Sequence, residues 1–314
     1  MTPTLQTIQE AHLRIVPYIH RTPVLTCQTI NDLAGASIYF KCENFQKVGA
    51  FKARGAMNAV LSLSDTDRQR GLTTHSSGNH AQAIAYAAKT TGTKAYIVMP
   101  SNCPKVKADA VRGYGAEIIF CEPNLQARED SVQEVIQKTG ATFIHPYNDY
   151  DVIAGQATAV KELMEDINQD FDTILTPVGG GGLLSGTALW VHYFSPKTKV
   201  IAGEPEGAAD AVLSFKSGKI EQAPYINTIA DGLLTTLGDK TLGIIRQHVS
   251  DIKLVNDYEI KAAMKLIWER MKIIIEPSCA VPLAVVLKYP NEFKGQKIGI
   301  ILTGGNVDLG KVVF

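Results

Sequence analysis

Four consecutive glycines, Gly179 to Gly182, stand between two segments of regular structure in the 314-residue sequence. The apolar run at 173–178 predicts a buried strand, and 183–194 predicts a helix. Glycine lets the backbone approach a ligand closely, and the first N–H groups of a helix have no partner inside it. Because the positive end of the helix dipole lies at the same place, we expect an anion at this loop, first of all a phosphate.

The glycine loop alone does not identify the phosphate. A P-loop needs a lysine directly after its second glycine, and Thr187 stands there instead. The dinucleotide pattern Gly-x-Gly-x-x-Gly also fails, because Leu184 or Ser185 occupies the place of the third glycine. Glu204 nevertheless stands about 20 residues further on, where an acid that binds a ribose would fall. A dinucleotide therefore stays open at this point.

Three other segments carry groups that can react or bind. Lys52 lies among small and apolar residues at a predicted helix start, where partial desolvation would make its amine a nucleophile; an ordinary solvated lysine is the alternative. Ser76, Ser77 and Asn79 open a second helix, either as another anion site or as ordinary N-capping residues. Thr303 ends a buried strand before two glycines, which a tight turn alone would also explain.

Strands and helices alternate through most of the chain, and this pattern positions the loops. Apolar runs predict strands at 37–43, 72–76, 94–99, 116–121, 142–144, 173–178, 199–204, 252–255 and 297–302. Helical periodicity predicts helices at 5–17, 51–63, 78–90, 104–115, 124–140, from after 156 to about 166, 183–194, 258–271 and near 282–287. Such units predict parallel, doubly wound open sheets of the α/β class. In these sheets ligands bind at the carboxyl ends of the strands, so we expect the loops to meet in one cleft.

The chain is long enough, and at 45% hydrophobic residues apolar enough, to form two domains. Polar segments near 64–71 and 145–150 mark the expected boundaries. We therefore expect a discontinuous large domain, 1–66 and 149–314, that carries the glycine loop. A small α/β domain, 67–148, is expected as an insertion in it.

Composition excludes several classes of function. The formal net charge is zero, which argues against a nucleic-acid or anionic-membrane surface. The N-terminal residues lack the pattern of a signal peptide, and the five cysteines contain no Cys-x-x-Cys pair, so we expect reduced thiols in a cytoplasmic protein. The seven histidines show no His-x-x-x-His spacing, which argues against a transition-metal site.

Taken together, the segments resemble one family. FQKVGAFKARGA around Lys52, SSGNHAQA, the four glycines, IEPSCAVPLA and LTGGNVD are similar to motifs of the fold-type II pyridoxal-phosphate enzymes, and most similar to the serine/threonine dehydratase and serine racemase group. The resemblance runs in order through essentially the whole chain. It implies the tryptophan synthase β-like architecture, with the small domain inserted in the large one. It also implies that the phosphate belongs to pyridoxal 5′-phosphate and not to a dinucleotide.

The resemblance implies a role for each motif residue. The implied cofactor-binding residues are Phe51, Lys52, Asn79, Gly179, Gly180, Gly181, Gly182 and Thr303. Lys52 would hold the cofactor covalently and act as the base at Cα, and Asn79 would bind the 3′-oxygen of the ring. Thr303 would face the pyridine nitrogen. A neutral hydroxyl cannot hold that nitrogen protonated as a carboxylate would, which favours elimination or racemisation over transamination.

The same resemblance implies the substrate residues and the reaction. The substrate carboxylate would bind Ser76, Asn79 and His80, with Arg128 as a further partner, and Ser77 would be a second catalytic acid or base on the face opposite Lys52. We expect an ammonia-lyase that converts L-serine, L-threonine or a similar 3-hydroxy amino acid to a 2-oxo acid and ammonia, and that also racemises serine. The alternatives are a dedicated serine racemase, a threo-3-hydroxyaspartate dehydratase or racemase, and a pseudoenzyme that senses an amino acid or a nucleotide. An NAD-dependent oxidoreductase is weaker, for want of the third glycine.

Metal, nucleotide and subunit partners also follow from the resemblance. Glu204, the Ala208 carbonyl and Asp210 match a divalent-cation site for Mg²⁺, Ca²⁺ or Mn²⁺, which replaces the ribose interpretation; a solvated acidic loop is the alternative. Members of the group bind ATP between the subunits of a homodimer, and the residues that match are Gln82, Tyr114 and Asn306, although Val48 departs from the expected polar residue. Tyr147 stands where mammalian racemases have asparagine, and we expect Asn148 or Asp149 to alter the substrate preference.

Overall fold

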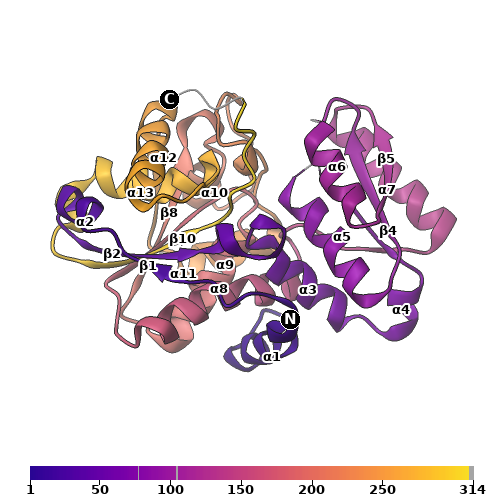
Figure 1. Cartoon of the computed structure of the whole chain (residues 1–314), viewed down its shortest axis with the longest axis horizontal. Helices are drawn as coiled ribbons and strands as arrows, with labels where there is room; N and C mark the ends of the chain where they lie inside the picture. The colour runs from indigo at the N-terminus through magenta and orange to yellow at the C-terminus, as the bar shows by residue number, and fades with distance from the viewer. Residues whose placement is uncertain (77, 104, 311–314) are drawn as a thin grey trace.

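Two open sheets divide the molecule into a larger and a smaller body (Figure 1). The computed structural model describes residues 1–76, 78–103 and 105–310. The six-stranded sheet has the order β1-β2-β10-β7-β8-β9, and the four-stranded sheet has the order β5-β4-β3-β6. The strands are β1 Val24–Leu25, β2 Ser37–Cys42, β3 Leu72–His75, β4 Ala95–Pro100, β5 Glu117–Cys121, β6 Thr142–Phe143, β7 Thr173–Pro177, β8 Lys199–Pro205, β9 Asp251–Val255 and β10 Lys297–Leu302.

All strand pairs of the two sheets are parallel except the pair of β1 with β2. The predicted α/β class with parallel open sheets is therefore confirmed. In Figure 1 the N-terminal and C-terminal parts of the chain share the larger body, and a middle part forms the smaller one. The strands of the smaller sheet lie between Leu72 and Phe143, while the exact domain limits at 66 and 149 stay a prediction.

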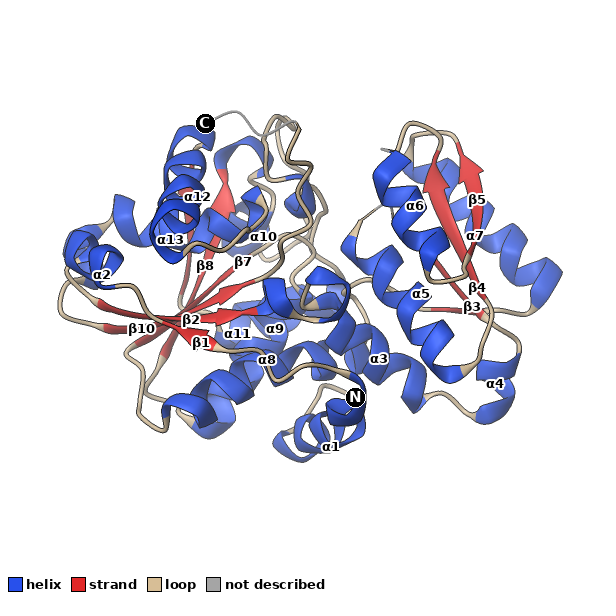
Figure 2. Cartoon of the chain, viewed as in Figure 1, coloured by secondary structure: helices blue, strands red, loops and turns tan. Residues whose placement is uncertain are grey.

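Helices connect the strands and cover the sheets (Figure 2). They are α1 Leu5–Ile15, α2 Gln28–Ala34, α3 Lys52–Ser62, α4 Asp65–Gln69, α5 Asn79–Thr91, α6 Lys105–Gly113, α7 Leu125–Thr139, α8 Tyr150–Ile167, α9 Gly182–Phe194, α10 Ala211–Ser217, α11 Asp239–His248, α12 Asp257–Met271, α13 Pro277–Lys288 and α14 Pro290–Phe293, with 3₁₀ turns η1 Val16–Tyr18, η2 Glu43–Phe45, η3 Lys47–Gly49, η4 Glu206–Ala208 and η5 Asp231–Leu233. The sequence did not predict α2, α4, α10, α11 or α14. It also placed the start of α13 too late, because proline is common at a helix start and the structure uses Pro277, leaving Pro282 inside the helix.

Apolar residues on both faces of the larger sheet explain why it is buried. One core joins residues of α1, α8, α9 and α11 to the sheet, and a second core joins residues of α2, α12 and α13 to the opposite face. All five residues of β7 are buried, as expected for a central parallel strand. The glycine loop that follows β7 therefore starts from a rigid position.

Helix α3 joins the two bodies. It packs against α8 of the larger body and α5 of the smaller one. The crossing with α8 depends on glycine, because a side-chain carbon at Gly155 would lie 2.5 Å from the Arg54 carbonyl oxygen. The fully buried Arg54 guanidinium also pairs with Glu43 at 2.7 Å and with Glu162 at 2.7 Å. These contacts hold the first turn of α3, which begins at Lys52.

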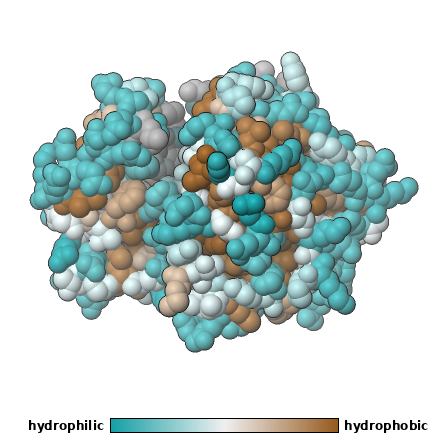
Figure 3. Space-filling model, turned by 180° about the vertical axis from the view of Figure 1, so that it is seen from behind, coloured by the Kyte–Doolittle hydropathy of each residue, from teal (hydrophilic) through white to brown (hydrophobic). Residues whose placement is uncertain are grey.

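Polar side chains cover much of the face seen from behind, with hydrophobic areas between them (Figure 3). Among the described residues, no helix is long and apolar enough to cross a membrane. Several large apolar side chains are nevertheless exposed, including Tyr225 at 58%, Ile226 at 63% and Tyr258 at 85%.

We predict that Gly155→Ala destabilises the fold by about 2 kcal/mol or more, because the added methyl group would collide with the backbone of α3. Gly243→Ala is the matched control, since Gly243 also lies inside a helix but has no atom within 4 Å of an added carbon. The control should be neutral or gain up to about 1 kcal/mol. Urea unfolding of both variants checks this, and equal midpoints for the two would contradict the proposed role of the crossing.

Candidate active site

The predicted loops meet at the carboxyl ends of the strands. The glycine loop follows β7, Thr303 follows β10, and Ser76 and Gly78 follow β3. Two further loops join them: the segment after β6 carries His145 to Tyr147, and the turn η3 precedes Lys52. The Tyr147 ring lies against Gly180, and the Asn79 amide bonds Glu276, so loops from both sheets converge as expected.

Backbone pairing ties the Lys52 segment to the Thr303 segment. The Phe51 N–H donates to the Thr303 carbonyl at 3.0 Å, and the Gly305 N–H donates to the Gly49 carbonyl at 3.0 Å. Between these bonds, Ala50 forms an isolated antiparallel bridge with Gly304. Residues more than 250 positions apart in the chain thus have a fixed separation.

Lys52 is a lysine with unusual surroundings. Its Nζ donates to the Pro146 carbonyl at 2.8 Å and lies 5.2 Å from the centre of the Phe51 ring. The side chain is partly exposed, yet enough protein surrounds it that desolvation lowers the pKa of Lys52 to about 8, against an opposing effect of Glu276. A substantial fraction of the amine is therefore neutral near physiological pH.

Glu276 is the main site residue that the sequence interpretation did not assign. It is 5% exposed, and its Oε1 accepts from the Asn79 amide at 2.9 Å. The Asn306 amide in turn donates to Asn79 Oδ1 at 2.8 Å, so three loops meet here. Burial, and then Asp231, raises the pKa of Glu276 to about 7. A single acid within the apolar run IIIEPSCAV was the sequence signal for it.

The four glycines form a tight cradle. Gly181 has φ +86°, and a side-chain carbon at Gly180 would lie 2.2 Å from the Tyr147 ring. At Gly182 the same carbon would lie 2.5 Å from Oε1 of Gln156, a buried amide for which no hydrogen-bond partner is found among the described residues. The Ser185 N–H makes the first bond along α9, so the N–H groups before it lack helical partners. The cradle fits a phosphate group.

A row of rings leads from the cradle into the smaller body. His75, Phe143, His145 and Tyr147 follow one another with centroid distances of 5.6, 5.8 and 4.6 Å. Burial, followed by the charges of His75 and Lys52, lowers the pKa of His145 to about 4, so this ring is neutral. Its Nδ1 accepts from the Asn148 N–H at 2.9 Å. Sequence reasoning missed His145, which has no local motif.

Comparison with known proteins agrees with this geometry. The family "Pyridoxal-phosphate dependent enzyme" matches residues 15–304. The chain belongs to this family. It is 52% identical to a serine racemase of Dictyostelium discoideum, over 99% of this chain and 97% of the relative, and 50% identical to a beta-hydroxyaspartate dehydratase of Paracoccus denitrificans, over 99% and 98%. A crystal structure of the Dictyostelium racemase superposes with a TM-score of 0.94, at 52% identity, over 98% of this chain and 100% of that one. The resemblance inferred from the motifs is confirmed.

In this pyridoxal-phosphate dependent enzyme, the residues predicted to bind the substrate carboxylate differ in their burial and in their hydrogen bonds. Ser76 Oγ accepts from the Gly78 N–H at 3.3 Å, and the His80 ring is buried with Nε2 3.1 Å from the Ile144 carbonyl. Burial, then Lys52, lowers the pKa of His80 well below its ordinary value. Arg128 has a buried Nε for which the described part of the chain offers no partner, and its charge lowers the pKa of His75 after the larger effect of burial. Ser77 lies outside the described residues.

The predicted cation ligands come together beside β8. Glu204 and Asp210 are 1% and 3% exposed, and burial raises their pKa values to about 8 and about 7. Glu204 accepts from the Ala211 N–H at 2.6 Å, while Asp210 Oδ2 has no partner among the described residues. Ala208 is buried between them in the chain. Two buried carboxylates with an unused oxygen fit an oxygen-coordinated cation, although the described residues contain no group of three or more acidic, His or Cys side chains for a metal.

The residues that match a nucleotide site each have their own environment in the structure. Asn306 donates to the Val48 carbonyl at 2.7 Å, and Gln82 is 8% exposed. Tyr114 packs edge-on against Tyr86, with ring centroids 5.9 Å apart. Val48 has φ 57°, which a β-branched residue rarely adopts. Asn306 thus touches both this segment and the Asn79 amide.

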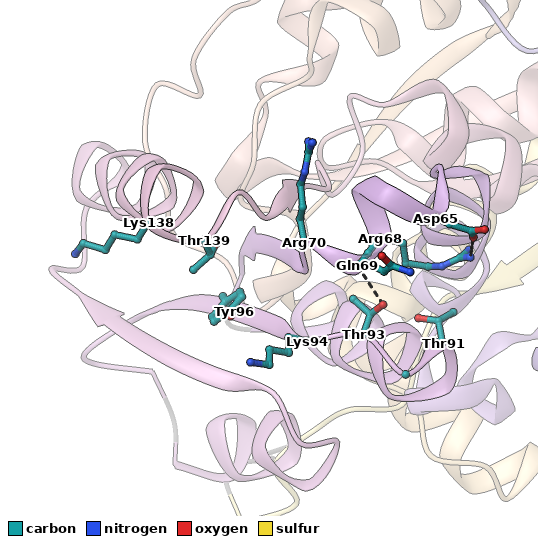
Figure 4. A pocket seen from close by; sticks show the side chains of 11 residues that line it. Asp65, Arg68, Gln69, Arg70, Thr91, Thr93, Lys94, Tyr96, Lys138 and Thr139 are labelled. Carbon is teal, nitrogen blue, oxygen red and sulfur yellow. Dashed lines mark hydrogen bonds and ion pairs between the residues drawn. The ribbon is translucent and has the colours of Figure 1, made fainter.

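A hollow of about 740 Å³ lies at the amino ends of the smaller sheet's strands, away from these loops (Figure 4). Three of its cationic side chains have acidic partners: Arg68 pairs with Asp65, Arg70 with Asp67 at 3.3 Å and Lys138 with Glu134 at 3.2 Å. Figure 4 shows Arg68 turned toward Asp65, whereas Lys94 and Lys138 point to another side. The hollow therefore lacks converging groups and is not the active site.

We predict a pH-dependent gain in stability for Glu276→Gln in cofactor-free protein. The raised pKa means that ionised Glu276 costs stability as the pH rises through about 7, whereas the protonated acid at lower pH does not. The variant keeps an oxygen for the Asn79 amide and should be more stable than the parent by up to about 3 kcal/mol at pH 8.5, with little difference at pH 5.

Urea unfolding at both pH values measures this difference. Glu134→Gln is the control, because Glu134 is 66% exposed by its side chain and should give no pH-dependent gap. Parallel pH profiles for the parent and Glu276→Gln would contradict the buried, raised acid.

Proposed function

We propose that the chain is a pyridoxal-phosphate dependent ammonia-lyase that converts a small 3-hydroxy amino acid to a 2-oxo acid and ammonia. The observation that carries this proposal is Lys52, whose pKa is lowered to about 8 and whose segment is paired with that of Thr303. The names of the two relatives, a serine racemase and a beta-hydroxyaspartate dehydratase, support the same substrate class. We assign Lys52 as the residue that holds the cofactor.

The bound cofactor would supply the electron sink that makes the substrate Cα–H acidic. In this proposal the Lys52 amine takes the proton from Cα, and its pKa near the working pH lets it pass that proton on to the departing hydroxyl. Loss of water leaves an enamine, which water hydrolyses to the 2-oxo acid and ammonia. Thr303 would face the ring nitrogen through a neutral hydroxyl, Asn79 would bind the ring oxygen, and the glycine cradle would hold the phosphate.

A substrate with a second carboxylate is the more specific candidate. Arg128 is near enough to His75, and His75 near enough to His145, for the charge of the first residue of each pair to lower the pKa of the second. The unpartnered Arg128 Nε is a ready donor for a carboxylate. This favours 3-hydroxyaspartate over serine or threonine, with the α-carboxylate at Ser76, Asn79 and the backbone near His80.

Racemisation of serine shares the first proton transfer with elimination. It requires a second acid or base on the opposite face of Cα, and Ser77 is our proposed residue for that role. The 52% identity to a serine racemase is the finding that favours this second activity.

Further partners belong to the same proposal. A divalent cation at Glu204, Asp210 and the Ala208 carbonyl fits the buried oxygens, and ATP is proposed as an activator near Gln82, Tyr114 and Asn306. The exposed apolar side chains support a homodimer. We propose a cytoplasmic location from the cysteine content.

A substrate panel tests the proposed reaction. Purified protein loaded with pyridoxal phosphate is incubated with L-serine, L-threonine and both threo-3-hydroxyaspartates, and 2-oxo acid, ammonia and D-amino acid are measured. We expect 2-oxo acid and ammonia in equal amounts, and a loss of at least about 100-fold in Lys52→Ala. D-serine without 2-oxo acid would indicate a dedicated racemase, and no product from any substrate would contradict the proposal.

We predict that Arg128→Met lowers kcat/KM for 3-hydroxyaspartate by about 10-fold or more relative to serine, because only the dicarboxylate loses a charged hydrogen bond. Arg112→Met is the control, since Arg112 is an exposed arginine that pairs with Asp109 at 2.9 Å. Steady-state kinetics with both substrates measure the ratio. Equal losses for the two substrates would exclude a role of Arg128 in choosing the dicarboxylate.

A further inference from the structure

One short segment forms a wall shared by the cation ligands and the glycine cradle. The backbone of Leu237 hydrogen-bonds the Asp210 carboxylate. The side chain of the same residue packs on the cradle, because a side-chain carbon at Gly181 would lie 2.7 Å from Leu237 Cδ2. Leu237 is 2% exposed, so it has little room to move independently of either neighbour.

A second contact from this segment reaches the cradle. Thr241 donates from Oγ1 to the Gly180 carbonyl at 2.9 Å, and its Cβ would lie 3.0 Å from a side-chain carbon at Gly181. Thr241 also accepts from the Gly238 N–H at 2.9 Å, which ties the start of α11 to the preceding loop. Residues 235–241 therefore touch Asp210 at one point and the cradle at two.

Tyr147 makes a separate connection between the same two places. Its ring lies against Gly180, and its hydroxyl hydrogen-bonds Thr235. After burial, the charge of Asp210 is the next cause that raises the pKa of Tyr147. Tyr147 therefore contacts both the cradle and the segment that bonds Asp210.

We propose that a divalent cation at Glu204 and Asp210 and a phosphate group at the glycine cradle bind cooperatively, through Leu237 and Tyr147. This inference rests on the proposed cofactor and cation sites. The coupling is positive, because a cation that fixes Asp210 also fixes the segment 235–241, which bonds Asp210 and packs on the cradle. Linkage requires that each ligand strengthens the other by the same factor.

Cofactor-free protein is titrated with 4-deoxypyridoxine 5′-phosphate, which has the ring and phosphate but no aldehyde to react with Lys52. Isothermal titration calorimetry gives Kd with Ca²⁺ and with Na⁺ at equal ionic strength, and Kd for Ca²⁺ with and without the analogue. We expect Ca²⁺ to tighten the analogue by about 5-fold or more, and the analogue to tighten Ca²⁺ by the same factor. Equal Kd values would overturn the coupling.

Variants locate the connection. The coupling factor is the ratio of the Kd values of one ligand without and with the other. Leu237→Ala should bring this factor close to one while both ligands still bind. Leu242, a buried leucine in α11, provides the control, and Leu242→Ala should leave the factor unchanged. Asp210→Asn should lose both Ca²⁺ binding and the effect of Ca²⁺ on the analogue, which excludes an effect of Ca²⁺ on the analogue in solution. Tyr147→Phe keeps the ring and loses the bond to Thr235, so it should weaken the coupling. This variant replaces Leu237→Ala as the test if Leu237→Ala does not fold.

The outcomes separate the two proposals. An analogue Kd that is the same with Ca²⁺ and with Na⁺ would overturn the coupling without contradicting the proposed reaction. No analogue binding in either buffer would contradict the phosphate cradle, and with it the proposed function. An unchanged coupling factor in both Leu237→Ala and Tyr147→Phe would overturn the assigned connection.

Discussion

The hydrogen bonds between residues 49–51 and 303–305 are the constraint on which the rest of the site depends. The Phe51 N–H bonds the Thr303 carbonyl, and the Gly305 N–H bonds the Gly49 carbonyl, both at 3.0 Å. A small aromatic cofactor held covalently at one side and through its ring nitrogen at the other needs a fixed distance between those two points. Backbone bonds provide that distance with less freedom than flexible side chains could. The α3–α8 crossing and the Arg54 ion pairs then fix the helix on which Lys52 lies.

Around this pairing, the protein buries ionisable groups at the expense of stability. Desolvation lowers the pKa of Lys52 to about 8 and raises the pKa of Glu276 to about 7. A fraction of each group is therefore uncharged near neutral pH, and an uncharged amine can accept a proton. The two carboxylates beside β8 are buried in the same way, with an unused oxygen on Asp210. Such groups are easier to explain as parts of binding sites than as parts of a core, because a core of apolar residues would be more stable.

The sequence predicted most of the framework and part of the site, for reasons that particular residues make clear. Gly179 to Gly182 follow a local rule, a glycine loop between strand and helix, and the structure has that loop. The pairing of the Lys52 and Thr303 segments has no local signal, and only the resemblance to a family brought them together. Helix α11 was missed because Gly238 and Gly243 make its sequence look like a loop. Glu276, His145 and Leu237 act through tertiary packing, so spacing along the chain could not identify them.

The central claim is that Lys52 is the lysine that carries pyridoxal phosphate. Borohydride reduction of the purified holoprotein, followed by proteolysis and mass spectrometry of the peptides, tests it most directly. The account predicts that reduction removes the visible absorbance of the cofactor and leaves a phosphopyridoxyl group on the peptide that contains Lys52. Labelling of a different lysine, or protein that incorporates no cofactor, would contradict it.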